Sequence, residues 1–219
     1  TEVDHFNAKR DPLRKLNLTC NATRAQLTAV QSKQIFQLID ALTAGIQEEK
    51  DRTARAALLL QRAVAYSEAQ NYSDAISDLD DYLSVDTASA MGHWERAVCQ
   101  QLLNSYEASK GTKTAMKLSQ VEGDFAVAIQ LYPKNAYTYY NRGNLFAAEK
   151  NYMRAIADYT HAISLDPNMA QAYYNRAVAR FYSGDVKSAQ SDLSHAGELG
   201  LYSAYALSKK MTEAQPKKK

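Results

Sequence analysis

Apolar residues near the start of the chain recur at the spacing of an amphipathic helix. Between residues 22 and 50 they follow steps of three and four along one stripe: Ile35, Leu38, Ile39, Leu42 and Ile46. A helix of about 3.6 residues per turn brings such residues onto a single face, so the pattern predicts a helix within 22–50. Thr23 stands ahead of the pattern and is a candidate N-cap.

The second half of the chain repeats its own pattern. The sequence Tyr-Tyr-Asn-Arg at 139–142 recurs at 173–176. Five further residues recur at the same distance of 34, so that Ala155, Asp158, His161, Ala162 and Leu165 return as Ala189, Asp192, His195, Ala196 and Leu199. A period of about 34 is typical of a helix–turn–helix unit, which buries its apolar face only by stacking on its neighbours. The sequence therefore predicts an all-α fold, an α-solenoid of antiparallel helical hairpins.

The period divides the repeated part of the chain into four units. They span about 56–89, 90–135, 136–169 and 170–203. The second unit is irregular, because Arg96 and Arg142 are 46 residues apart instead of 34. Counting back from Pro133 places the twelve extra residues near 104–115. Such an insertion is either a tolerated surface extension or a functional one.

The flanking segments complete the predicted organisation. Residues 1–21 are polar and turn-rich, and we expect them to form an irregular N-terminal arm. The 22–50 segment is either a single N-terminal packing helix or a degenerate repeat. The repeat domain covers 51–203, and residues 204–219 are expected to form a capping helix followed by a basic tail.

The units resemble tetratricopeptide repeats. That family's pattern places aromatic and small residues at fixed positions of two helices and ends each unit with a proline. The third unit matches it at Tyr139, Gly143, Phe146, Ala155, Tyr159, Ala162 and Pro167. The other units match at fewer positions but in the same register, so the resemblance covers roughly residues 55–203. The small residues are expected where two helices approach closely, because a larger side chain would overpack the contact.

The resemblance implies a concave groove lined by the first helix of each unit, in which a partner peptide binds. Carried onto this chain, the candidate groove residues are Trp94, Tyr137, Tyr140, Asn141, Asn144, Tyr174, Asn175, Phe181, Tyr182 and Lys209. Tyrosine and tryptophan are enriched in binding hot spots, and asparagine can pair with a peptide backbone. The alternative is that Tyr140 and Tyr174 pack between neighbouring first helices.

One subset of the family holds the C-terminal carboxylate of chaperone tails with lysine and asparagine side chains. Asn144, Asn175 and Lys209 fit that pattern, but Tyr140 and Tyr205 stand where it needs lysines. Without those cations a carboxylate loses most of its charge-assisted hydrogen bonds. The sequence therefore disfavours recognition of a chaperone tail.

Composition narrows the classes of partner. The net charge is +2, and Lys217, Lys218 and Lys219 more than account for it, so we expect no nucleic-acid partner. No apolar run approaches the roughly 20 residues that span a bilayer. Cys20 and Cys99 have no metal-ligand spacing and form no disulfide framework. The chain begins at Thr1, which is typical of a processed or truncated chain, and the sequence assigns no compartment.

Catalytic motifs are not recognisable in the sequence. It has no Gly-rich phosphate loop, no Gly-x-Ser-x-Gly and no His-Glu-x-x-His. His161 and His195 share one repeat position without ligand partners nearby, so they are interpreted as solvent-facing. The recurring aspartates are interpreted as a repeated solvent face: Asp78, Asp158 and Asp192. We therefore expect no catalytic residue, no metal and no cofactor.

These observations favour a non-catalytic protein–protein interaction module that binds a partner peptide in its groove. The alternative is a structural scaffold module of a larger assembly. In that alternative the 22–50 helix and the 104–115 insertion provide contacts, and the chain can self-associate. An enzyme of unrecognised type is the third and least favoured class.

Overall fold

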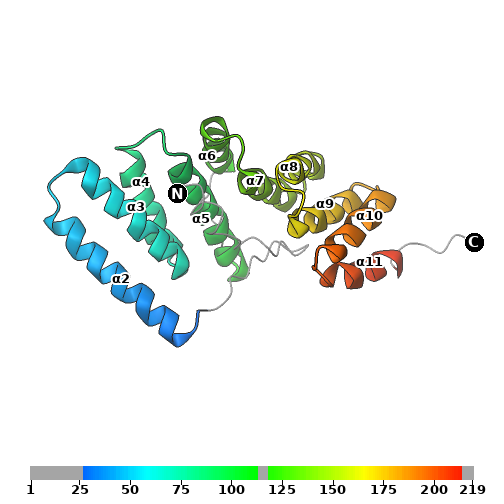
Figure 1. The fold of residues 1–219 in the computed structure, drawn as a ribbon, viewed down its shortest axis with the longest axis horizontal. Helices are drawn as coiled ribbons and strands as arrows, with labels where there is room; N and C mark the ends of the chain where they lie inside the picture. Colours follow the sequence, from blue (N-terminus) through cyan, green and yellow to red (C-terminus); the bar gives the residue numbers. More distant parts are fainter. Residues whose placement is uncertain (1–26, 113–117, 214–219) are drawn as a thin grey trace, which may run out of the picture. The chain divides into compact units, whose positions relative to one another are not determined.

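The computed structural model describes residues 27–112 and 118–213, and its regular structure there is entirely α-helical (Figure 1). This confirms the predicted all-α fold class. The helices are α2 (Ala29–Glu48), α3 (Arg52–Glu68), α4 (Tyr72–Leu83), α5 (Ala90–Ser109), α6 (Leu118–Leu131), α7 (Ala136–Ala148), α8 (Tyr152–Leu165), α9 (Ala170–Tyr182), α10 (Val186–Glu198) and α11 (Ser203–Glu213).

The described helices fall into two compact units, which meet in the sequence between Pro133 and Lys134. In the first unit, successive helices from α2 to α6 pack on one another, and in the second unit successive helices from α7 to α11 do the same. Short connections make successive helices antiparallel. The core of each unit therefore lies between successive helices.

Polar side chains start the second helix of three hairpins. Asn71, Asn151 and Asp185 accept hydrogen bonds from backbone N–H groups in the first turns of α4, α8 and α10. The residue before each of these caps has a positive φ, between 58° and 92°, which reverses the chain. α2 begins at the N-cap Thr28, whose side chain takes part in a capping box. The predicted cap Thr23 lies outside the described residues.

Close approach of the two helices in the α7–α8 hairpin depends on a glycine. A Cβ atom on Gly143 of α7 would lie 2.8 Å from Cε1 of Tyr159 on α8. Tyr159 is fully buried, as are Ala155 and Ala162 of the same helix. The other hairpins carry a fully buried alanine at the position of Gly143: Ala63, Ala97 and Ala177. Small residues thus leave room for the side chains that fill each hairpin.

An arginine on the first helix and an aspartate on the second bridge each of the four described hairpins. The pairs are Arg62–Asp78, Arg96–Asp124, Arg142–Asp158 and Arg176–Asp192. In each pair Nε and Nη2 donate to the two carboxylate oxygens over 2.6–2.9 Å. Hydrogen bonding to the carboxylate raises the pKa of Arg62 and of Arg96. This two-point contact fixes both the distance between the helices and their register.

The aspartates of these bridges are buried. All four are only 4–6% exposed. The interpretation of Asp78, Asp158 and Asp192 as a repeated solvent face is therefore wrong. A recurring position shows only that a residue type returns once per unit, and a paired buried carboxylate recurs as regularly as a solvated one.

The same arginines link hairpins to the helix that precedes them. Nη1 of Arg62 donates to Thr43 of α2 over 3.0 Å. In the same way, Nη1 of Arg96 donates to Asp80 of α4 over 2.7 Å, and Nη1 of Arg176 donates to Thr160 of α8 over 3.1 Å. One side chain thus holds three helices together.

The irregular second hairpin keeps its bridge. Arg96 and Asp124 are 28 residues apart, whereas Arg142 and Asp158 are 16 apart, so the twelve extra residues lie between them. α5 has 20 residues and α7 has 13, so seven of the extra residues lengthen α5. The others fall between α5 and α6. The insertion extends the hairpin without displacing the bridging pair.

Replacing Gly143 by alanine should destabilise the protein by about 1–3 kcal/mol, because the added methyl group would collide with the buried Tyr159 ring. Gly123→Ala is the matched control, since a Cβ atom at Gly123 of α6 meets nothing within 4 Å. There alanine should stabilise by about 0.5–1 kcal/mol through its higher helix propensity. Urea unfolding followed by circular dichroism measures both effects, and equal shifts for the two variants would contradict the packing described for Gly143.

Arg142→Met should lower the free energy of unfolding by about 3 kcal/mol, because it leaves the buried Asp158 carboxylate without its main partner. Asp158→Leu should also lower the free energy of unfolding, because it removes the carboxylate to which Arg142 donates. The double variant should recover much of the loss, since no unpaired charge remains. A double-mutant cycle on urea midpoints checks this expectation. Additive effects of the two substitutions would show that the bridge does not couple α7 to α8.

Candidate functional site

The predicted groove residues lie on first helices and on α11. Trp94 belongs to α5, in the first unit. The other nine lie in the second unit, with Tyr137, Tyr140, Asn141 and Asn144 on α7, Tyr174, Asn175, Phe181 and Tyr182 on α9, and Lys209 on α11. The second unit therefore holds most of the candidate site.

Half of these residues are buried. Those at most 3% exposed are Trp94, Tyr140, Asn141, Asn144 and Asn175. Tyr137, Tyr174 and Phe181 are half-buried, and Tyr182 and Lys209 are exposed. The burial of Tyr140 agrees with the alternative that it packs between first helices, while Tyr174 keeps part of its surface accessible.

A layer of hydrogen bonds joins buried side chains of α7, α8 and α9. Oη of Tyr159 donates to Oδ1 of Asn144 over 2.8 Å. Nδ2 of Asn175 donates to the same oxygen over 3.0 Å and to Oη of Tyr140 over 3.1 Å. We call these four residues the amide layer. It couples three helices of the second unit through neutral groups.

Two atoms of the amide layer have no hydrogen-bond partner among the residues that the structure describes. They are Nδ2 of Asn144 and Oδ1 of Asn175, and both are buried. An unpaired buried polar group costs about 1–3 kcal/mol. One atom is a donor and the other an acceptor, so together they match the carbonyl oxygen and the N–H of a peptide backbone.

Aromatic side chains cluster where α8 begins and α9 ends. The rings of Tyr152 and Tyr182 stack with centroids 5.2 Å apart and planes at 17°. Phe181 meets Tyr182 edge-on at 5.7 Å. Nearer the start of α9, burial raises the pKa of Tyr174, and its hydroxyl can donate a hydrogen bond. Exposed Tyr182 offers a large, rigid contact surface of the kind found in binding hot spots.

The two recurring histidines are exposed and lie against tyrosines. His161 has its ring centroid 4.1 Å from that of Tyr139, and His195 lies 4.4 Å from Tyr173. In the part of the chain that the structure describes, no three metal-ligating side chains come together. Each histidine thus packs its ring against a tyrosine on the other helix of its hairpin.

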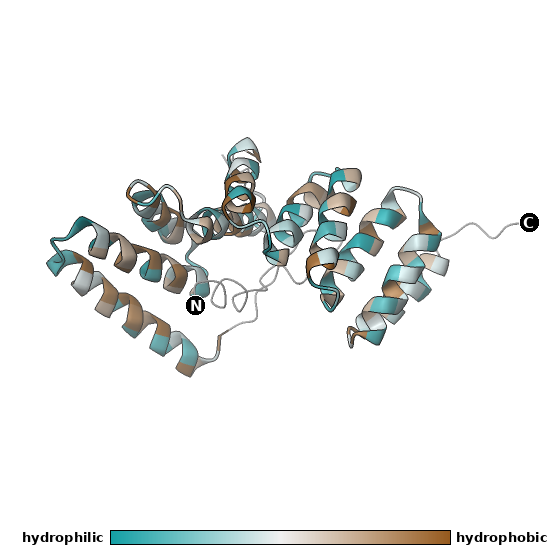
Figure 2. Ribbon diagram, turned by 45° about the horizontal axis from the view of Figure 1, so that its top comes forward, coloured by the Kyte–Doolittle hydropathy of each residue, from teal (hydrophilic) through white to brown (hydrophobic). Residues whose placement is uncertain are grey.

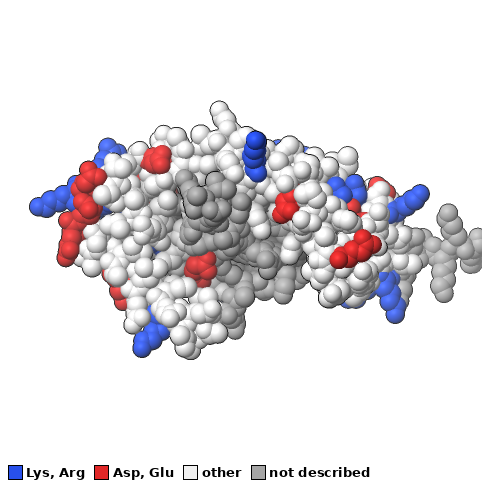
Figure 3. All heavy atoms as spheres, in the orientation of Figure 1, with Lys and Arg blue, Asp and Glu red and all other residues white. Residues whose placement is uncertain are grey.

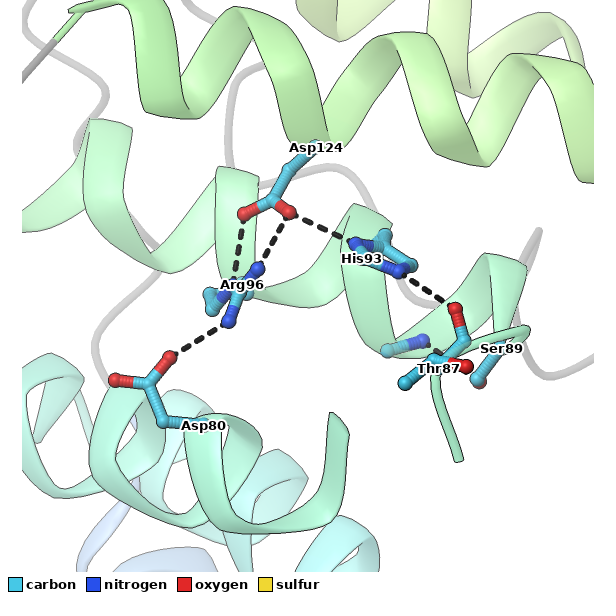
Figure 4. Close-up of polar contacts among 7 residues, drawn as sticks. Asp80, Thr87, Ser89, His93, Arg96 and Asp124 are labelled. Atoms are coloured by element: carbon cyan, nitrogen blue, oxygen red, sulfur yellow. Dashed lines mark hydrogen bonds and ion pairs between the residues drawn. The ribbon is translucent and has the colours of Figure 1, made fainter. Parts of the chain in front are cut away.

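A charged cluster in the first unit was missed by the sequence patterns (Figure 4). His93 Nδ1 lies 2.8 Å from Oδ1 of Asp124, and its Nε2 lies 3.1 Å from the carbonyl oxygen of Thr87. Both neighbours are acceptors, so only the doubly protonated ring can donate to both. Arg96 donates to Asp124 and to Asp80. The sequence spacing from Arg96 to Asp124 could have revealed the cluster. Its 28 residues equal the 16 residues of a regular arginine–aspartate bridge plus the twelve residues of the insertion.

The fourth hairpin carries a second arginine at its bridge. Arg180 stands where the third hairpin has Phe146, and its Nη1 donates to Oδ2 of Asp192 over 2.8 Å. A pocket of about 430 Å³ lies beside this pair, lined also by Tyr173, Arg176, Ser191, Ser194, His195 and Glu198. Cofactor sites are mostly apolar. This polar pocket, with charges of both signs, does not have that character.

Charged residues of both signs are scattered over the face shown in Figure 3. Mixed charge of this kind differs from the continuous basic stripe typical of nucleic-acid binders. Of the helices described, none combines the length and the apolar character needed to cross a membrane.

Comparison with known proteins supports the repeat pattern. Residues 136–169 match the family model for the tetratricopeptide repeat. The crystal structure of MamA superposes with a TM-score of 0.66 at 19% identity, over 83% of this chain and 99% of that one. A tetratricopeptide repeat protein from Parabacteroides merdae gives 0.66 at 17% identity, over 84% and 69%. PilF from Pseudomonas aeruginosa gives 0.54 at 18% identity, over 68% and 63%.

At identities this low, the similarity to solved structures establishes a shared fold and nothing about partners. The family match covers residues 136–169, which is one period of 34 residues and contains the hairpin formed by α7 and α8. The small residues and buried tyrosine of that hairpin explain the pattern physically. Residues 136–169 therefore match a tetratricopeptide repeat, and the described chain shares the fold of solved tetratricopeptide-repeat proteins.

Proposed function

We propose that the chain is a non-catalytic interaction module that binds an extended segment of a partner protein along α7 and α9. The observation that carries this proposal is the unpaired donor and acceptor of the amide layer, on Asn144 and Asn175. A polypeptide backbone presents the complementary pair of groups at every residue except proline.

Hydrogen bonds hold the side chains of the amide layer in one orientation. Three hydrogen bonds among Tyr140, Asn144, Tyr159 and Asn175 fix the orientation of both amides. Fixed orientation lowers the entropy lost on binding. Because both unpaired atoms are buried, a bound segment must displace the side chains that cover them, and the gain is the two hydrogen bonds that the free protein lacks.

The flanking aromatic residues supply apolar contact area. Tyr137 and Tyr174 are half-buried on α7 and α9, and Tyr182 is exposed at the end of α9. Of the cations that a carboxylate clamp needs, Lys209 is present, while Tyr140 and Tyr205 replace the two lysines. The partner segment is accordingly recognised through its backbone and apolar side chains rather than through a terminal carboxylate.

Selection from a displayed peptide library against the full chain supplies ligands, and calorimetry on synthetic copies measures their Kd. Asn175→Ala removes the unpaired acceptor and should weaken binding about tenfold, the equivalent of about 1.4 kcal/mol. Tyr174→Ala should weaken it about thirtyfold, as expected for an aromatic hot spot worth about 2 kcal/mol. Tyr202→Ala is the matched control, because Tyr202 is exposed and lies outside α7 and α9.

Thermal melts accompany each variant, so that lost folding is not mistaken for lost binding. A folded Tyr174→Ala variant that binds every selected peptide as tightly as the wild type would refute the proposed surface. Failure of the full chain to select any peptide would count against the function itself.

A further inference from the structure

The fourth hairpin carries one more positive charge than its bridge uses. Arg176 donates to both carboxylate oxygens of Asp192 over 2.9 and 2.7 Å. Arg180 adds a second guanidinium, whose Nη1 donates to Oδ2 of the same aspartate over 2.8 Å. Two cations share one carboxylate, so one positive charge is left over. The side chain of Arg180 is only 23% exposed, so water solvates this charge less well than it would at an open surface.

The other hairpins have no positive charge at the position of Arg180. The residue four places after the bridging arginine is Tyr66, Gln100 and Phe146 in the first three hairpins. The rings of Tyr66 and Phe146 lie against their bridging arginines, with centroids 5.5 and 5.8 Å from the guanidinium carbons. An aromatic or a neutral polar side chain therefore satisfies the hairpin here. Packing of the fold alone does not call for an arginine.

The guanidinium of Arg180 has donors to spare. Bridging arginines such as Arg176 hold their aspartates through Nε and Nη2, which form a planar fork. This fork fits a carboxylate or a phosphate with two parallel hydrogen bonds. On Arg180 the fork has no partner among the described residues, because Nη1 makes the contact with Asp192. The fork is therefore free to hold an anion.

The pocket of about 430 Å³ beside this pair supplies further donors. Ser191 and Ser194 of α10 line it, and both are exposed, so their hydroxyl groups are accessible. The helices nearest the C-terminus carry many hydrophilic residues, teal in Figure 2. The fork and the two hydroxyls together offer donors to three oxygen atoms. A phosphate monoester presents three such oxygens, whereas a carboxylate has two.

The carboxylates that line the pocket do not offset the charge of Arg180. Both oxygens of Asp192 are already paired with Arg176. The side chain of Glu198 is 64% exposed, so solvent screens it, and it lies 3.5 Å from Nδ1 of His195. The Ser194 hydroxyl lies 3.5 Å from Oε1 of Glu198, a contact long enough for a phosphate oxygen to replace.

We propose that this pocket binds a phosphate monoester through the free fork of Arg180 and the hydroxyls of Ser191 and Ser194. The group belongs either to a free small molecule or to a phosphorylated side chain of a partner protein, since both present the same three oxygens. The pocket lies between α9 and α10 and shares no residue with the amide layer. The proposal is therefore independent of peptide binding along α7 and α9.

Titration of the full chain with inorganic phosphate, followed by NMR, tests the site. Ionic strength is held constant with sodium chloride, because salt screens exposed charges. The Nε–H signal of Arg180, identified by its loss in Arg180→Phe, should shift and saturate. The backbone signals of Ser191 and Ser194 should shift with the same Kd.

Two variants separate the fork from the charge. Arg180→Phe puts the residue of the third hairpin at this position and should weaken phosphate binding by about tenfold or more, because two charge-assisted hydrogen bonds are lost. Arg180→Lys keeps the positive charge in the last turn of α9 but lacks the fork, and should weaken binding by about fivefold. Lys187→Ala is the matched control, since Lys187 is exposed on α10 and does not line the pocket. That variant should bind as the wild type does.

Glu198→Gln tests the sign of the ligand's charge. It removes a carboxylate from the pocket and should strengthen phosphate binding by about twofold to threefold. Weaker binding by Glu198→Gln would contradict an anion site. So would a wild type that binds no phosphate, or a loss in Lys187→Ala equal to that in Arg180→Phe.

A short peptide distinguishes the two sources of the phosphate. N-acetyl-Gly-phosphoserine-Gly-amide should bind more tightly than inorganic phosphate if the site takes a phosphorylated side chain, and no more tightly if it takes a small molecule. The unphosphorylated peptide should not compete for the site. Tyr174→Ala, which weakens the proposed peptide binding, should leave the Kd for inorganic phosphate unchanged, so the two proposals fail separately.

Discussion

The bridge between one arginine and one buried aspartate is the constraint on which each hairpin depends. Removing a carboxylate from water is costly unless a charged partner and full hydrogen bonding replace the solvent. The bridges meet that condition with two hydrogen bonds of 2.6–2.9 Å each. Because both groups must meet, the two helices can pair in one register only. The third nitrogen of Arg62, Arg96 and Arg176 then reaches the preceding helix, so that the same group also controls stacking.

Variation around this constant bridge gives each hairpin its own character. Thr43 and Thr160 leave their bridges electrically neutral, whereas Asp80 adds a negative charge that His93 can balance when both of its nitrogens are protonated. Arg180 adds a positive charge in the fourth hairpin and replaces an aromatic residue, and a polar pocket lies beside it. The fold tolerates these changes because the bridge itself is retained.

Some features of the described chain run against the tendency of proteins to pair every buried polar group and cover every apolar face. The amide layer leaves one donor and one acceptor unpaired in the second unit, and α2 leaves Leu38 and Val30 open in the first. Local departures from good packing and pairing are common at functional sites, where a partner supplies what the free chain lacks. The unpaired donor and acceptor of the amide layer are the groups on which the proposed peptide binding rests.

The sequence alone determined the helical class, the hairpin period and the size of the insertion, because each follows from spacing along the chain. It also identified Gly143 and Ala155 as close-contact positions. It did not distinguish a solvated aspartate from a bridged one, since both recur at the same interval. Nor did it show that Trp94 and Asn175 are buried. Burial depends on which side chains of neighbouring helices cover a position, and hydrogen-bond partners depend on angles and distances across three helices. Those relations exist only after the hairpins stack, so the tertiary structure decided them.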